Sequence, residues 1–151
     1  MELLVQENST QWNKSKDYHR PRILIVEDDM SLKPFWLHLI ETVDETAEIK
    51  WMTTQEGAFH SLKKWNQSGR PYDLVISDVF LSGQKTGVDL WRESERINVP
   101  FMLTSVISPK RLEKMFSPGE PMPVLLQKPI NIDECKVLIK SFLEKDEPRA
   151  S

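Results

Sequence analysis

The sequence predicts one α/β domain, a doubly wound sheet of five parallel strands covered by five helices. Short apolar runs of strand length alternate with amphipathic stretches of helix length between residues 22 and 143. This alternation is typical of a parallel sheet with helices on both faces, because right-handed crossovers carry the chain from strand to strand. Polar side chains suited to chemistry follow four of the predicted strands, at the edge where such sheets bind ligands.

The first half of the chain supplies two strands and two helices. Residues 22–26 are an apolar run that predicts a strand buried on both faces. A helix follows, with Ser31 as its cap and Pro34 in its first turn, where a missing N–H costs least. Residues 48–53 predict a weaker strand, and residues 55–65 predict a second helix.

Two more buried strands follow, at residues 73–77 and 100–104, with a helix expected over 87–96 between them. Ser108 and Pro109 have the cap-then-proline order that begins a helix, which we expect to be short.

The last strand and helix come after a proline-rich loop, Ser117 to Pro123. Residues 124–127 predict the strand, and Asn131 with Glu134 resembles a capping box that opens the helix. The expected core face of this helix consists of Ile132, Cys135, Leu138, Ile139, Phe142 and Leu143.

Composition and charge indicate a cytoplasmic protein without a general affinity for nucleic acid. The chain is 39% apolar and 28% charged, with a formal net charge of −3. Cys135 is the only cysteine, so an intramolecular disulfide is impossible and a reducing compartment fits best. The apolar runs fall short of the ~20 residues of a membrane helix, so no membrane insertion is expected. We expect a flexible N-terminal arm at residues 1–20, a domain at 21–145 and a C-terminal tail at 146–151.

The side chains at the carboxyl edge come from four strands. They are Glu27, Asp28 and Asp29 after the first strand, Asp78 after the third, Thr104 and Ser105 at the end of the fourth, and Lys128 and Pro129 after the fifth. Because the carboxyl ends of parallel strands meet at one edge, we expect these residues to converge. Asp29 is assigned to the turn into the next helix rather than to the site.

Gathering Glu27, Asp28 and Asp78 would be costly without a cation. Two like charges roughly 4 Å apart repel by about 4 kcal/mol at an effective dielectric near 20. Mg²⁺ prefers such oxygen ligands, so we expect a Mg²⁺ site that Mn²⁺ could also fill. Together with Lys128 and Thr104, this set supplies what phosphoryl transfer to a carboxylate needs, with Asp78 as the acceptor.

At these residues the sequence resembles a known family, the receiver domain of response regulators in bacterial two-component systems, which includes the chemotaxis receiver. The motifs are Arg22-Ile-Leu-Ile-Val-Glu-Asp-Asp29, Asp73-Leu-Val-Ile-Ser-Asp78, Phe101-Met-Leu-Thr-Ser105 and Gln127-Lys-Pro-Ile130. The resemblance covers almost all of residues 21–145. It implies a flavodoxin-like fold with strand order 2-1-3-4-5.

The resemblance also implies a role for each site residue. The implied metal ligands are Glu27, Asp28, Asp78 and the backbone carbonyl of Phe80, with Asp28 as a direct ligand. The implied phosphoacceptor is Asp78, and the implied phosphoryl-binding and switch residues are Thr104 and Lys128. Ser105 and Pro129 are supporting residues, and the bond before Pro129 is commonly cis in the family. The donor would be a phosphohistidine on a sensor histidine kinase or on a histidine phosphotransfer protein.

Several positions depart from the family pattern, mostly on the expected output side. Ser82 stands where proline is usual, and the glycine that follows, Gly87, comes one residue late. Leu125 replaces an aromatic residue at the output position. Phe80 and Val106 would flank the approach of a hydrolytic water and cannot orient it, so we expect a slowly hydrolysed phosphoryl group.

The sequence therefore predicts a stand-alone response regulator rather than a turnover enzyme, because few residues follow the last predicted helix. It would act through a downstream protein partner, through a homodimer, or by phosphorelay. A phosphorylation-independent interaction module is the main alternative, favoured by Ser82 and Leu125. A phosphohydrolase similar to haloacid dehalogenases would need a second acid at Phe80, and a Rossmann-type nucleotide site would need a glycine-rich turn after the first strand.

Overall fold

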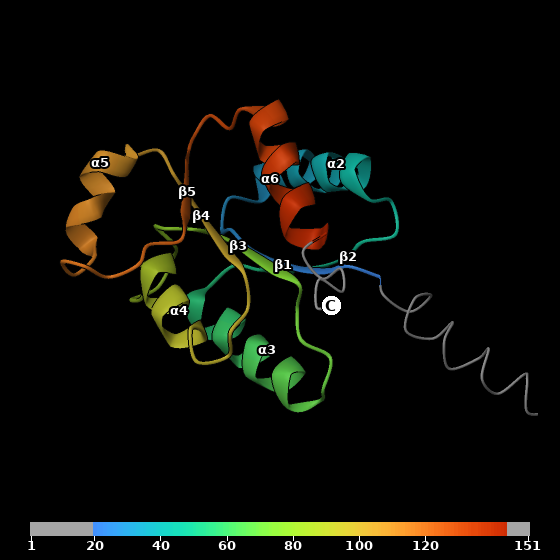
Figure 1. Ribbon diagram of the computed structural model, residues 1–151, viewed down its shortest axis with the longest axis horizontal. Helices are drawn as coiled ribbons and strands as arrows, with labels where there is room; N and C mark the ends of the chain where they lie inside the picture. Colours follow the sequence, from blue (N-terminus) through green and yellow to red (C-terminus); the bar gives the residue numbers. More distant parts are fainter. Residues whose placement is uncertain (1–19, 145–151) are drawn as a thin grey trace, which may run out of the picture.

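A parallel sheet forms the centre of the structure, a computed structural model that describes residues 20–144 (Figure 1). Its strands are β1 (Arg22–Val26), β2 (Glu48–Met52), β3 (Leu74–Asp78), β4 (Phe101–Ser105) and β5 (Val124–Gln127). The order is β2-β1-β3-β4-β5 and all neighbours pair in parallel, so the predicted fold class and strand order are confirmed. The expected N-terminal arm, apart from Arg20, and the expected C-terminal tail lie outside the described residues.

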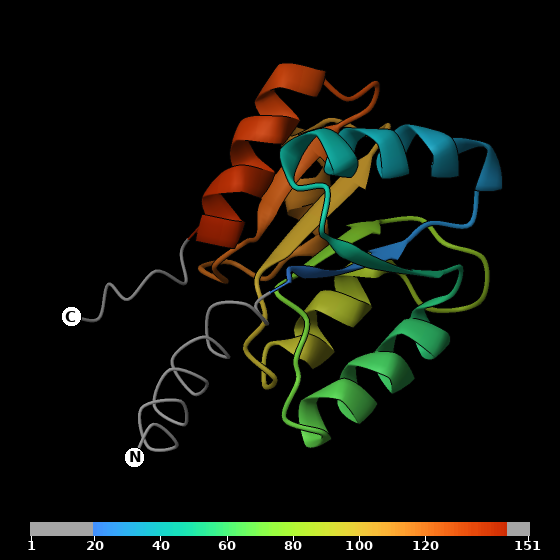
Figure 2. The same cartoon turned by 90° about the vertical axis from the view of Figure 1, so that its right-hand side faces the viewer.

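Helices cover both faces of this sheet (Figures 1 and 2). The helices are α2 (Lys33–Val43), α3 (Gln55–Gln67), α4 (Gly87–Ser94), α5 (Pro109–Leu112) and α6 (Ile132–Glu144), with short 3₁₀ turns η1 (Met30–Leu32) and η2 (Glu113–Met115). One face carries α2 and α6, and the other carries α3 and α4. None of the helices between residues 20 and 144 is long and apolar enough to cross a membrane.

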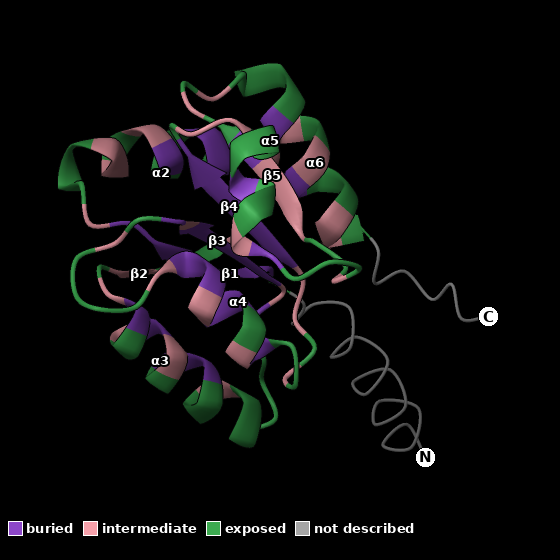
Figure 3. Cartoon of the chain, turned by 90° about the vertical axis from the view of Figure 1, so that its left-hand side faces the viewer, coloured by how far each residue is buried: buried purple, intermediate pink, exposed green. Residues whose placement is uncertain are grey.

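Side chains alternate along the strands between two cores. Ile23 and Ile25 pack with the buried residues of α2 and α6, whereas Leu24 and Val26 pack with those of α3 and α4. All four are 0–1% exposed, which is why the sequence shows a continuous apolar run rather than an alternating one. Figure 3 shows the same layering, with the buried strands β1, β3 and β4 between helices whose outer faces are exposed.

Polar side chains fix where the helices begin. Thr54 caps α3 by accepting a hydrogen bond from the Gly57 N–H, and Thr86 forms a capping box at α4 with Asp89. Asn131 accepts a hydrogen bond from the Glu134 N–H at 2.8 Å, as expected for the start of α6. Each such cap contributes about 1 kcal/mol.

The predicted start of the first helix is wrong. Asp29, not Ser31, is the capping residue, because its carboxylate accepts hydrogen bonds from both the N–H and the hydroxyl of Ser31. These bonds begin η1, and α2 starts only at Lys33, with Pro34 in its first turn as expected.

The strands expected at 73–77 and 100–104 each lie one residue later, and the helix expected at 55–65 extends to Gln67. Three further expectations also need correction. The helix predicted over 87–96 ends at Ser94, where the chain turns so that Asn98 takes a positive φ of 65°. The second strand ends at Met52, one residue early. Ile132 is 48% exposed and does not join the core. The first residue of α6 that packs on the sheet is Cys135, one turn later.

Candidate metal and phosphoacceptor site

The backbone ladder of the sheet sets the positions of the site residues. The N–H of Glu27 donates to the carbonyl of Met52, the last residue of β2. This bond extends the β1–β2 pairing one residue past the end of β1. The N–H of Lys128 donates to the carbonyl of Ser105 at 2.8 Å and fixes the chain just after β5 in the same way. These bonds place Glu27 and Lys128, which are far apart in sequence, at the same edge of the sheet.

Three carboxylates meet at this edge, as the sequence predicts. Glu27, Asp28 and Asp78 each offer an oxygen, and these oxygens lie within 4.8 Å of one another. The Lys128 ammonium lies 3.0 Å from Glu27 Oε1 and 3.4 Å from Asp78 Oδ2. Three carboxylates and one ammonium leave an excess of two negative charges when all are ionised, so the donor set fits a divalent cation.

The electrostatics of Asp78 reflect this crowding. Burial raises the pKa of its carboxyl and the charge of Glu27 raises it further, to about 6, although Lys128 acts in the opposite direction. Burial alone would lower the pKa of Lys128, but its contacts with Glu27 and Asp78 outweigh burial and raise that pKa. The lysine is therefore charged at neutral pH, and a cation bound beside Asp78 would stabilise the ionised form of that acid.

Glu27 and Asp28 differ in the hydrogen bonds that their carboxylates accept. Both oxygens of Glu27 are occupied, Oε1 by Lys128 and Oε2 by the N–H of Asp29 at 3.1 Å. Asp28 accepts the hydroxyl of Ser82 on Oδ2 at 2.6 Å. Among the residues that the structure describes, none donates to Asp28 Oδ1, so Asp28 and Asp78 offer the more accessible oxygens for a cation.

Thr104 lies beside the candidate acceptor. It is 1% exposed and is the direct cross-strand partner of Asp78 between β3 and β4. Next to it, the Ser105 hydroxyl accepts the N–H of Ile107 at 3.0 Å and so shapes the loop after β4. The peptide bond between Lys128 and Pro129 is cis, as the family resemblance implies.

The apolar residues at the rim lie where the sequence places them, after β3 and β4. Phe80 is 49% exposed and Val106 is 66% exposed. Leu125, at the expected output position, is half-buried and packs against the core beneath α3 and α4. The role of the Phe80 carbonyl as a metal ligand stays a prediction.

Sequence reasoning missed what Gly87 does at this site. A Cβ at this position would lie 2.2 Å from the Asp78 carbonyl oxygen and 2.9 Å from Ser77 Oγ, distances that no side chain tolerates. The start of α4 can therefore approach the backbone of the candidate acceptor only through a glycine. The sequence did hold one signal of this role: a glycine, Gly87, one residue later than in the family pattern. The bond from Ser82 to Asp28, across 54 residues, had no counterpart in the sequence pattern.

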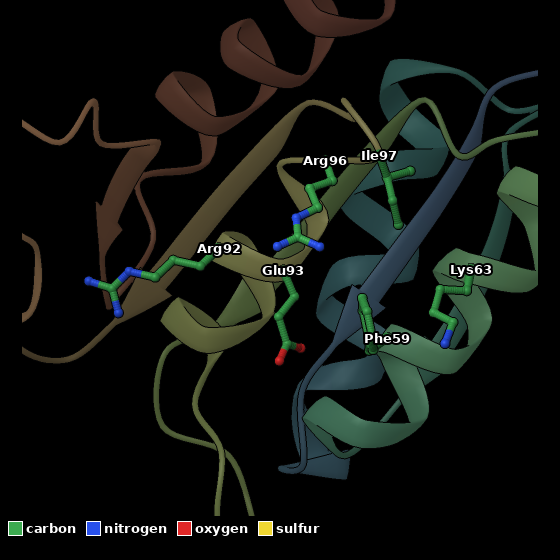
Figure 4. Close-up of a pocket in the computed structure, with 6 residues that line it drawn as sticks. All are labelled: Phe59, Lys63, Arg92, Glu93, Arg96 and Ile97. Carbon is green, nitrogen blue, oxygen red and sulfur yellow. The ribbon is translucent and has the colours of Figure 1, made fainter.

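A cavity of about 560 Å³ lies away from this edge, between α3 and α4 (Figure 4). It is lined by Phe59, Lys63, Arg92, Glu93, Arg96 and Ile97. Two of its charged groups are already paired: Arg92 binds Glu120 through two nitrogens at 3.1 Å, and Glu93 binds Lys85 at 3.1 Å. The chemistry of the carboxyl edge therefore makes that edge, not this cavity, the candidate site.

Comparison with known proteins gives structural relatives only. No model of a known protein family and no curated protein matches the sequence. A response regulator receiver protein from Sinorhizobium medicae WSM419 is similar at 19% identity and a TM-score of 0.65, over 86% of this chain and 99% of that one. A signal receiver domain of an HD domain-containing protein from Pseudomonas fluorescens Pf-5 is similar at 21% identity and a TM-score of 0.68, over 87% and 92% of the two chains.

A third similar structure is a putative response regulator from Chloroflexus aurantiacus J-10-fl, at 22% identity and a TM-score of 0.65, over 82% of this chain and 98% of that one. At these identities the likeness concerns the fold. The strand order of this chain, and the share of each chain that the matches cover, agree with the resemblance found in the sequence. The chain has the fold of a response-regulator receiver domain.

Proposed function

We propose that the protein is a response regulator whose Asp78 accepts a phosphoryl group in a Mg²⁺-dependent reaction. The observation that carries this proposal is the convergence of Glu27, Asp28, Asp78 and Lys128 at the carboxyl edge of a receiver-type sheet. The donor would be a phosphohistidine of a sensor histidine kinase or of a histidine phosphotransfer protein.

In the proposed step, an oxygen of the Asp78 carboxylate attacks the phosphorus in line. The new O–P bond forms as the P–N bond to the donor imidazole breaks, and the bonding pair returns to that nitrogen. The product is an aspartyl phosphate on Asp78 and a free histidine on the donor. Asp78 must be ionised to attack, and with a pKa of about 6 it is largely ionised at neutral pH; a cation bound beside it would favour the ionised form further.

The residues around Asp78 have distinct tasks in this proposal. Asp28 and Asp78 would hold Mg²⁺ directly, with Glu27 and the Phe80 carbonyl completing the protein ligands. Bound Mg²⁺ supplies neutralisation of charge on the transferring oxygens. Lys128 would hold a phosphoryl oxygen with its ammonium, and the Thr104 hydroxyl would donate to another.

We propose that the modified protein acts in the cytoplasm by binding a protein partner, by pairing with a second copy, or by relaying the phosphoryl group. Phosphorylation adds about −1.5 to −2 charge beneath the loops that follow β3 and β4. It shifts a conformational equilibrium only as far as the two states differ in affinity for that group. A phosphorylation-independent interaction module is the second candidate, because Leu125 replaces the usual aromatic and α5 has only four residues.

The intact mass after incubation with acetyl phosphate tests the proposal. We expect a gain of one phosphoryl mass that requires Mg²⁺ and disappears in Asp78→Ala. Asp133→Ala, which removes an exposed acid at the start of α6, serves as the matched control and should still be modified. No mass gain in folded wild-type protein, with acetyl phosphate or with a panel of phosphorylated histidine kinases, would favour the interaction module instead.

A further inference from the structure

A loop residue contacts a member of the acidic cluster that Lys128 does not bind in the structure. The Ser82 hydroxyl, between β3 and α4, donates to Asp28 Oδ2 at 2.6 Å. This is the length of a charge-assisted bond between a hydroxyl and a carboxylate, which is about twice as strong as a neutral hydrogen bond. The bond crosses from the loop that follows Asp78 to the acid that follows β1.

The backbone of Ser82 is fixed independently of this bond. Ser82 forms an isolated parallel bridge with Thr54, and Thr54 in turn caps α3 through the Gly57 N–H at 3.0 Å. Directly after it, Gly83 adopts a φ of 101°, a conformation that turns the chain and that favours glycine. The position of the Ser82 hydroxyl is therefore set by the start of α3, through Thr54, and by the turn at Gly83.

The consequence concerns the orientation of a carboxylate. With Oδ2 of Asp28 held by Ser82, its Oδ1 is the oxygen left for a cation shared with Asp78. A free carboxylate must lose rotational freedom when it binds a metal, whereas one already held by a second group loses less.

We propose that Ser82 is a positioning residue for the divalent cation, holding Asp28 in the orientation that binds it. This inference rests on the proposed function, because it assumes that the acidic cluster binds Mg²⁺. It also gives Ser82 a task at the metal site, although the sequence marked this residue only as a departure on the output side.

The test is the Mg²⁺ affinity of the full chain, measured by isothermal titration calorimetry without any phosphoryl donor. We expect Ser82→Ala to raise the Kd roughly 10-fold, the lower end of what groups holding metal ligands usually contribute. Ser82→Thr keeps a hydroxyl at the same position and should restore most of the affinity. A role in the fold alone would not produce this rescue.

The chain offers a matched control in Ser31→Ala. Ser31 makes a bond of the same length, 2.6 Å, to the carboxylate of Asp29, which lies next to Asp28 but outside the cluster. We expect its Kd to stay within twofold of the wild type. Amide hydrogen exchange gives a second readout: Mg²⁺ should protect residues 79–86 in the wild type and less so in Ser82→Ala.

The outcomes separate this inference from the proposed function. Wild-type protein that binds Mg²⁺ with an affinity unchanged in Ser82→Ala would overturn the role of Ser82 and leave the metal site standing. Wild-type protein that binds no Mg²⁺ would overturn both. A loss of affinity in Ser31→Ala as large as in Ser82→Ala would also overturn it, since the effect would not be specific to Asp28.

Discussion

At the scale of single residues, Asp78 is held where its own charge is disfavoured. Its ordinary pKa is 3.8, and burial together with Glu27 raises the pKa to about 6 in the folded protein. Between these values the folded protein binds a proton that the unfolded chain has released. The contribution of Asp78 to the stability of the metal-free protein therefore falls as pH rises from about 4 to about 6, and is level above that.

Asp78→Asn should remove this pH dependence. Near pH 4 the variant and the metal-free wild type should unfold at similar urea concentrations. Above pH 7 the variant should be more stable, by about 2 kcal/mol after allowance for solvent screening at a partly exposed group. Urea unfolding at pH 4, 6 and 8 in the presence of a chelator measures this. A stability difference that stays constant across this range would contradict the raised pKa.

Phe80 and Val106 give a second prediction at this scale. Both are large, apolar and about half or more exposed beside the candidate acceptor, and neither can orient an attacking water. Phe80→Asn combined with Val106→Glu should therefore shorten the lifetime of the phosphoryl group on Asp78. The decay of the phosphorylated mass after removal of acetyl phosphate measures this. An unchanged or longer lifetime in the double variant would show that these side chains do not limit hydrolysis.

At the scale of elements, the start of α4 is fitted to the backbone of β3. Gly87 donates its N–H to the Val79 carbonyl at 2.8 Å, and its missing side chain leaves room for the Asp78 carbonyl. The helix thus packs against the strand that carries the candidate acceptor, with Thr86 capping it.

Gly87→Ala should push α4 away from β3. The added methyl group would sit 2.2 Å from the Asp78 carbonyl oxygen, a backbone atom that cannot step aside. Overpacking of this kind costs about 1–3 kcal/mol of unfolding free energy. Gly57→Ala is the control, because its methyl group would meet side-chain atoms rather than backbone: the Thr54 hydroxyl at 3.1 Å and Met52 Sδ at 3.7 Å. Thermal unfolding of both variants tests the difference, and equal losses would argue against the tight contact.

At the scale of the whole molecule, the sheet and the site could be predicted from the sequence for the same reason. Buried parallel strands are continuous apolar runs, and the right-handed crossover rule places their carboxyl ends together. Glu27, Asp78 and Lys128 follow directly from that topology. The bonds from Ser82 to Asp28 and from Arg92 to Glu120 could not be predicted, because a bond to a loop residue 54 or 28 positions away in sequence leaves no periodicity.

The excess of negative charge at the site predicts that Mg²⁺ stabilises the whole fold. A ligand that binds only the folded state contributes about 2.7 kcal/mol when present at about 100 times its Kd. Mg²⁺ should therefore raise the Tm by several degrees at neutral pH, compared with KCl of equal ionic strength. Asp28→Asn combined with Asp78→Asn should abolish the increase. An increase that persists in this variant would place the cation elsewhere.

Two neighbouring residues of α4 each form an ion pair with a residue of a different loop. Glu93 pairs with Lys85, which lies in the loop after the candidate acceptor, and Arg92 pairs with Glu120 in the proline-rich loop before β5. The two loops share no direct tie of this kind, yet both are anchored within one peptide unit of a single helix. Both loops are therefore held by adjacent residues of α4, so a displacement of α4 that left its two ion pairs intact would move both loops with it.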